Sequence, residues 1–200
     1  MTWKEIKLAT LQKMYSAEGN NIPSDDSSRD YLASMIPAAN EGLVMMCTDK
    51  IHIVKSIDVD STMGDPVGKF RRCRMKDLAH DFYEFSGEIY YTEGLTHQRT
   101  QAYRTEAQDV LLIPGSFSGV FSVYYNAYPE TITSLTEDND ELTAPMEVQV
   151  LLPLYMASQL YKEDDNGIAT TLRNEFEVAY DRLSENNPML KSEPEDETGW

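Results

Sequence analysis

The chain has 200 residues, of which 41% are hydrophobic, and this is enough for one large domain or two small ones with a buried core. Its 34 acidic residues outnumber 17 basic ones, which gives a formal net charge of -17 at pH 7. A surface this acidic repels phosphate backbones, so we do not expect the chain as a whole to bind nucleic acid in a sequence-specific way. No run of about 18 apolar residues occurs, so we also expect no membrane-spanning segment.

The first 48 residues have the pattern of helices. Thr2 and Glu5 match a capping box in front of an amphipathic stretch, which predicts a helix as far as about Ser16. A second helical region is expected over residues 27–48. Pro37 lies inside this region, and we expect it to kink or divide the helix, because proline lacks the N–H that the helical ladder needs.

The apolar pattern then changes from helical spacing to alternation. Gly-bearing turns and aromatic enrichment favour a compact antiparallel β-domain, similar to a small sandwich. Ser86-Gly87, Glu93-Gly94 and Pro114-Gly115 are the expected turns. The expected strands cover residues 51–59, 70–75, 82–85, 88–92, 109–113 and 119–127.

Residues 145–184 read as two helices joined by a tight polar turn, a helical hairpin. Apolar residues spaced by three and four mark one face of each helix. Pro153 either lies inside the first helix, where it would kink it, or is the first helical residue. The predicted core and packing positions of the hairpin are Leu151, Pro153, Leu154, Tyr155, Leu160, Tyr161, Ile168, Leu172, Phe176, Ala179 and Leu183.

These patterns predict an α+β fold, in which a discontinuous helical domain holds an inserted antiparallel β-sandwich-like domain. The N-terminal helical part covers residues 1–55, and the inserted β-domain covers 56–130. The C-terminal hairpin, within 131–186, is expected to pack on the N-terminal helices because each part has an apolar face without a partner. Residues 187–200, rich in acids and with two prolines, read as a flexible acidic tail.

Charge is unevenly distributed along the sequence. From Glu130 onward there are 17 acidic and 4 basic residues. The one basic cluster contains Lys69, Arg71, Arg72, Arg74 and Lys76. Because the chain is so acidic, we expect this cluster to pair with acidic surface of its own chain or of a neighbouring subunit.

Sequence signatures of catalysis are absent. There is no HExxH, no GxSxG and no phosphate-binding glycine loop. Cys47 and Cys73 have no metal-type spacing and are expected to be free thiols. Asp77, His80 and Asp81 lie close enough in sequence for a metal site or an acid–base pair, although such loop residues are more often solvated. We therefore assign no catalytic, cofactor-binding or metal-binding residue, and we expect neither enzymatic activity nor a cofactor.

Residues 120–184 resemble the C-terminal part of the head-to-tail connector proteins, also called adaptor or neck proteins, of tailed bacteriophages. In that group a tyrosine-rich strand end leads through an acidic linker into a helix with the phrase LP-Y-A-LYK-DD and then a closing helix. The residues that carry the resemblance are Tyr125, Tyr128, Pro129, Leu152, Pro153, Tyr155, Ala157, Leu160, Tyr161, Lys162, Asp164 and Asp165.

The resemblance implies a structural virion protein that forms a homo-oligomeric ring, typically of twelve subunits, below the portal. Such a ring joins capsid to tail at the neck of the virion and leaves a channel for DNA ejection. Its partners would be other copies of itself, the portal protein and the next neck or tail protein, with packaged DNA passing close by. The protein would be made in the cytoplasm of the host bacterium, and it would not contact a membrane. The inserted β-domain departs from the smallest members of such families.

If the ring surrounds DNA, acidic residues that face the channel would repel the phosphates and keep the duplex from sticking. The linker and the tail each supply one candidate group. The candidates are Glu137, Asp138, Asp140, Glu141, Glu193, Glu195, Asp196 and Glu197.

A second hypothesis treats the chain as a binding module, in which the β-sandwich, on a helical oligomerisation scaffold, binds a ligand such as carbohydrate. This hypothesis requires exposed aromatic side chains on the β-domain, because sugars stack on aromatic rings. The candidates are Tyr83, Phe85, Tyr90 and Tyr91.

Overall fold

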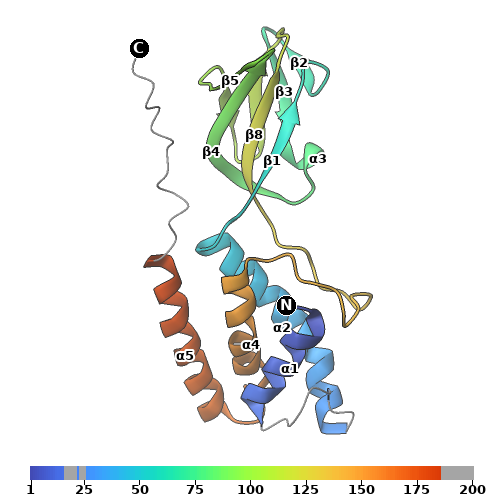
Figure 1. Cartoon of the computed structure of the whole chain (residues 1–200), viewed down its shortest axis with the longest axis vertical. Coiled ribbons are helices and arrows are strands. Elements are labelled where there is room, and N and C mark those ends of the chain that lie inside the picture. Colours follow the sequence, from blue (N-terminus) through green and yellow to red (C-terminus); the bar gives the residue numbers. More distant parts are fainter. Residues whose placement is uncertain (16–21, 23–25, 186–200) are drawn as a thin grey trace. The chain divides into compact units, whose positions relative to one another are not determined.

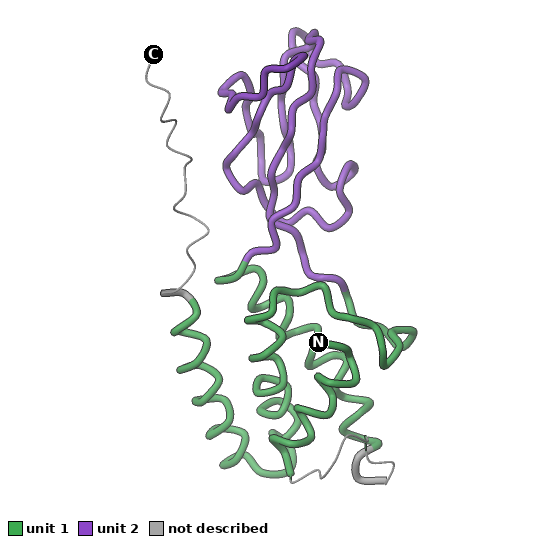
Figure 2. The backbone as a smooth tube through the Cα atoms, viewed as in Figure 1, with its two compact units in different colours: residues 1–51, 131–200 green, residues 52–130 purple. Residues whose placement is uncertain are grey.

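The computed structural model describes residues 1–15, 22 and 26–185. The chain forms helices and two antiparallel sheets, which confirms the α+β class. It divides into two compact units (Figure 2): Met1–Ile51 with Thr131–Trp200, and His52–Glu130. We call these the helical unit and the β unit. The β unit begins a few residues earlier than the sequence pattern suggested. None of the helices in the described ranges is both long and apolar enough to cross a membrane.

The helical unit begins with α1 (Trp3–Met14) and α2 (Asp26–Asp49). The capping box at α1 is formed as predicted, since Thr2 Oγ1 accepts the N–H of Glu5 at 3.3 Å and the Glu5 carboxylate accepts the N–H of Thr2 at 2.8 Å. Helix α2 continues through Pro37 without being divided. Near its C-terminal end Gly42 permits close packing, because a Cβ there would lie 2.7 Å from the ring of Tyr155.

The hairpin consists of α4 (Met146–Leu160) and α5 (Asn166–Glu185). Helix α4 is the centre of the unit, because it packs against α1, α2 and α5 (Figure 1). It begins after Pro145 and runs through Pro153, so Pro153 is not its first residue. In the turn, the Asp165 carboxylate accepts the N–H groups of Gly167 at 2.9 Å and Ile168 at 3.1 Å, and it thereby caps α5.

The β unit contains two four-stranded sheets in which every pair of strands is antiparallel. The first sheet has the order β1-β8-β4-β5 and the second the order β2-β3-β7-β6. The short helix α3 (Met75–Leu78) follows β3. The strands are β1 (Ile53–Val59), β2 (Asp65–Val67), β3 (Phe70–Arg74), β4 (Phe82–Glu93), β5 (Thr96–Arg99), β6 (Arg104–Glu106), β7 (Val110–Pro114) and β8 (Val120–Ala127).

One core fills the space between the two sheets, as in a sandwich. Its buried members come from strands of both sheets, from α3 and from the residue that follows α3. The core residues are Val59, Cys73, Met75, Ala79, Phe82, Ile89, Leu111, Ile113, Phe121, Val123, Tyr125 and Ala127.

The sequence pattern was wrong about Ser86-Gly87. These residues do not form a turn between two strands, because β4 is continuous from Phe82 to Glu93. The pairing of β4 with β8 shifts register between Phe85 and Ile89 instead, and Gly87 has a φ of 95°. A glycine with positive φ is typical of a bulge, which interrupts the alternation of side chains and mimics a turn in the sequence.

Candidate interaction surfaces

The hairpin residues lie mainly in the core of the helical unit. On α4, Leu154 and Tyr155 are buried, and Phe176 of α5 is 1% exposed, with its ring 5.2 Å from that of Tyr155. Pro153 is buried as well. The remaining predicted positions except one are partly buried: Leu151, Leu160, Tyr161, Leu172, Ala179 and Leu183.

Ile168 is the exception, because its side chain is 43% exposed and the prediction that it belongs to the core is wrong. The buried line of α5 instead passes through Ala169, Phe176 and Tyr180. The sequence pattern missed Tyr180, whose hydroxyl donates to Asp49 of α2 at 2.9 Å. Burial and this carboxylate raise the pKa of Tyr180. An aromatic residue with a polar tip satisfies a helix interface as well as an aliphatic one does, so apolar spacing alone left Tyr180 out.

The outward side of α5 carries a shallow, open groove of about 420 Å³. Val178, which lines it, is 55% exposed. The other lining residues are Thr171, Asn174, Glu175, Ala179 and Arg182. A single exposed apolar residue among charged ones is ordinary for a protein surface, so this groove by itself does not mark a binding site.

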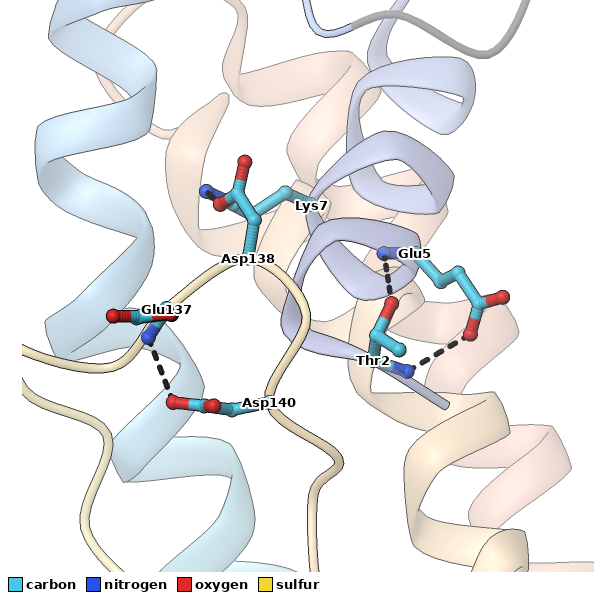
Figure 3. A network of polar contacts seen from close by, with 6 residues as sticks. All are labelled: Thr2, Glu5, Lys7, Glu137, Asp138 and Asp140. Atoms are coloured by element: carbon cyan, nitrogen blue, oxygen red, sulfur yellow. Dashed lines mark hydrogen bonds and ion pairs between the residues drawn. The ribbon is translucent and has the colours of Figure 1, made fainter.

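The acidic linker lies against the N-terminus of α1 (Figure 3). The carbonyl of Asp140 accepts the N–H of Trp3, and the carbonyl of Asp138 accepts that of Lys4, both at 2.9 Å. These bonds satisfy N–H groups that have no partner inside the helix. The Asp138 carboxylate also forms an ion pair with Lys7.

The linker acids therefore divide into two kinds. Asp138 and Asp140 hold the linker in place, because the Asp140 carboxylate accepts the N–H of Glu137 at 2.8 Å (Figure 3). Within the described part of the chain, the carboxylates of Glu137 and Glu141 form no hydrogen bond or ion pair, and both residues are exposed. The four tail candidates, Glu193, Glu195, Asp196 and Glu197, lie outside the described residues.

The basic cluster is separated by the alternation of β3. Arg71 points inward and donates to three carbonyls of the β1–β2 loop, those of Met63 at 2.7 Å, Gly64 at 2.8 Å and Thr62 at 3.2 Å. It is a brace for that loop and is not available to a partner. Arg72 and Arg74 lie on the opposite, outer side of the strand, and Lys69 and Lys76 are exposed at either end of it.

Strand pairing adds an arginine that the sequence pattern did not include. In the register of the second sheet, Leu112 of β7 lies between Arg72 of β3 and Arg104 of β6. The Arg104 guanidinium lies over the ring of Phe70, 5.9 Å from its centroid. Only the pairing of strands far apart in sequence reveals this neighbour.

None of the four aromatic candidates of the β unit is fully exposed. Phe85 and Tyr91 pack against the core. Tyr83 lies 5.0 Å from the ring of Tyr128. Tyr90 belongs to the outer face of the first sheet, where it stacks on His97 at 5.0 Å with an angle of 3° between the rings.

The acidic and histidine residues at 77–81 do not assemble a reactive site. Asp77 and His80 are exposed, whereas Asp81 binds Lys55 at 2.7 Å and accepts the hydroxyl of Tyr125 at 3.1 Å. Burial, together with the hydrogen bond to Asp81 and its charge, raises the pKa of Tyr125 to about 12. Among the described residues no group of three or more His, Cys, Asp or Glu is placed to hold a metal ion.

Comparison with known proteins adds no family to this description. No family model matches the chain, and none of the curated proteins matches it.

Proposed function

We propose that this chain is a ring-forming head-to-tail connector of a tailed bacteriophage, a structural protein that binds below the portal and joins capsid to tail around a DNA channel. The observation that carries the proposal is the hairpin. Residues that carry the resemblance to connectors have packing and capping roles there: Tyr155 is in the core and Asp165 caps α5. These are structural roles, and they support a proposal in which the hairpin contributes packing rather than reactive groups.

The linker supplies the channel-facing acids in this proposal. Of the four linker acids, Glu137 and Glu141 have carboxylates that hold no other residue in place within the described chain, so they remain available to repel DNA. Ring symmetry repeats each charge once in every subunit, which turns a single acid into a ring of like charge. Screening limits this repulsion to about 8 Å at physiological salt, so residues near the channel matter most.

Electron microscopy of the purified protein, alone and mixed with a portal, tests the proposal. We expect closed rings, typically of twelve subunits, either in solution or on the portal. Light scattering coupled to gel filtration gives the mass of the same sample. A protein that stays monomeric at high concentration and does not bind the portal would exclude a connector.

Charge reversal tests the channel separately from assembly. The double variant Glu137→Lys and Glu141→Lys should assemble normally but eject DNA more slowly, because the duplex would adhere to the reversed charges. A matched control reverses two exposed acids of the hairpin, Glu147 and Glu163, and should leave ejection unchanged. Ejection at the normal rate in both variants would exclude the linker as the channel lining.

One observation favours a second candidate function, carbohydrate binding by the β unit. Tyr90 and His97 form a flat stacked pair on the outer face of the first sheet, and Tyr124 packs edge-on against Tyr90 with 5.7 Å between ring centroids. Flat rings on a sheet surface can stack against sugar rings. Glycan-array binding that is lost in Tyr90→Ala would support this function, and an absence of binding would exclude it.

A further inference from the structure

The outer face of the second sheet concentrates positive charge in an otherwise acidic protein. Phe70, Arg72 and Arg74 lie on this side of β3, since Cys73 between the two arginines is buried in the core. Arg104 joins them from β6. We call these four residues the arginine face. Asp65 and Glu106 are the acids on the four strands of this sheet, and Lys69 and Lys76 flank β3.

Much of this positive charge is not neutralised within the described chain. Arg72 binds Glu106 at 3.0 Å, with both side chains half exposed. Arg74, Lys69 and Lys76 are exposed and form no ion pair with any described residue. Three exposed cations on and beside β3, none of them in an ion pair within the described chain, attract an acidic partner.

The arginine face also has an apolar end. Phe70 is 39% exposed, and its register partner Val67 on β2 is 42% exposed. The Arg104 guanidinium covers one side of the Phe70 ring. Arginine beside an exposed aromatic ring is a common setting for a partner's aromatic side chain, because both ring and guanidinium offer flat stacking surfaces.

The sequence of the chain contains a segment with the complementary chemistry. Residues 186–200, which lie outside the described structure, include Glu193, Glu195, Asp196 and Glu197 and end in Trp200. Glu195 and Glu197 are two residues apart, as Arg72 and Arg74 are, and in extended chains this places both pairs about 6.6 Å apart on one side. Three further residues reach Trp200, a distance of about 10 Å, which is sufficient to reach Phe70.

We propose that residues 193–200 of one copy bind the arginine face of a second copy. Glu195 lies opposite Arg74, Glu197 lies opposite Arg72, and Trp200 packs on Phe70. The segment runs antiparallel to β3, and Gly199 lets the chain bend toward the ring. The contact needs only a second copy of this chain, so it stands whether or not the protein forms a ring below a portal.

Binding of a fluorescent peptide of residues 186–200 to the chain ending at residue 185 tests the contact, because the missing tail cannot compete. The double variant Arg72→Glu and Arg74→Glu should weaken binding at least tenfold. A peptide with Trp200→Ala should bind several-fold more weakly, and binding should weaken with added salt. A control variant, Lys13→Glu and Lys162→Glu, changes the net charge equally at exposed sites of the helical unit and should bind within twofold of the unchanged protein.

A charge swap protects the test against a misfolded variant. A peptide with Glu195→Lys and Glu197→Lys should bind the doubly reversed protein better than it binds the unchanged one. Equal binding to both proteins, or no measurable binding of the original peptide at low salt, would overturn the proposal. Binding of a single-stranded oligonucleotide in place of the peptide would overturn it as well, and would assign the arginine face to phosphate.

Complementation shows whether the contact joins two copies. The full chain with the reversed arginines keeps residues 186–200 but lacks the positive charge of the arginine face. The chain ending at residue 185 keeps the arginine face but lacks those residues. Their mixture should co-purify more strongly than a mixture in which both chains end at residue 185. If the two mixtures co-purify equally while the peptide binds normally, the tail contacts the arginine face of its own copy. That result would overturn the proposal as stated.

Discussion

The helical unit and the β unit are built on opposite principles. The helical unit combines two stretches of sequence separated by the whole β unit, and α4 joins them through contacts with α1, α2 and α5. The β unit is one continuous stretch, yet its sheets pair strands in an order unlike their order in sequence. Each helix of the discontinuous unit can therefore be recognised from its own sequence pattern. The sheets of the continuous unit, in contrast, depend on pairing between strands that are far apart in sequence.

The two units also differ in charge. The helical unit, with its tail, has 23 acidic and 9 basic residues, and the β unit has 11 and 8. An isolated cluster of cations in the less acidic unit can be neutralised within its sheet or by another molecule. Within the sheet Glu106 neutralises Arg72, whereas Arg74 remains exposed.

The largest expected effect is on the core of the helical unit. Phe176→Ala should lower the free energy of unfolding by about 3–5 kcal/mol, because the removed ring is buried between those of Tyr155 and Tyr180. Urea denaturation followed by circular dichroism at 222 nm measures this. Val178→Ala, on the exposed side of the same helix, is the control and should change stability by less than about 0.5 kcal/mol. Equal effects would remove Phe176 from the core.

A smaller effect is expected at Arg71, which holds the β1–β2 loop of the β unit. Arg71→Met should cost about 1–2 kcal/mol, since it removes three hydrogen bonds to loop carbonyls while keeping most of the side-chain volume. Arg74→Met removes a charge from the same strand without such bonds and serves as the control. Thermal melts of both variants compare them, and a greater loss in the Arg74 variant would contradict the assignment.

The N-terminal cap of α1 should contribute about 1 kcal/mol. Thr2→Ala removes the oxygen that accepts the N–H of Glu5, whereas Thr2→Ser keeps it. The two variants should therefore differ in denaturation midpoint, with the serine variant close to the original protein. If alanine and serine are equivalent, the linker carbonyls alone hold the end of α1.

Asp81 should make the stability of the β unit depend on pH. Burial by itself raises the pKa of Asp81, but hydrogen bonds from Lys55 and Tyr125 outweigh it, so the pKa lies below its ordinary value. A lowered pKa stabilises the folded state above the unfolded pKa of about 4, and this contribution is lost as the pH falls through the folded pKa. Melts from pH 6 to pH 2 should show a smaller acid-induced loss in Asp81→Asn than in the original protein.

Removing the β unit should have the smallest effect on the other unit. Replacement of residues 52–130 by a short flexible linker should leave a helical protein that unfolds cooperatively, because α1, α2, α4 and α5 supply one core. Circular dichroism during urea titration gives the transition. A gradual loss of signal would show that the two units depend on each other for folding.

Local sequence patterns determined where α1 begins and that two helices form a hairpin near the C-terminus. Thr2 and Glu5 predicted the start of α1, and the apolar spacing predicted the hairpin, because caps and helical faces involve residues three or four positions apart. The same reasoning failed at Ile168, where the spacing was right but the direction of the face was set by packing on α4 and by the bond from Tyr180 to Asp49 of α2.

Only the tertiary structure decided which charges are available. Arg71 and Arg72 are neighbours in sequence, yet the alternation of β3 directs one toward loop carbonyls and the other to the outer face. Arg104 joins that face through strand pairing, and the Asp138 carboxylate is engaged by Lys7 of α1. Charge is a property of single residues and can be counted in a sequence, but its partners come from segments far apart in the chain, so its availability is a property of the fold.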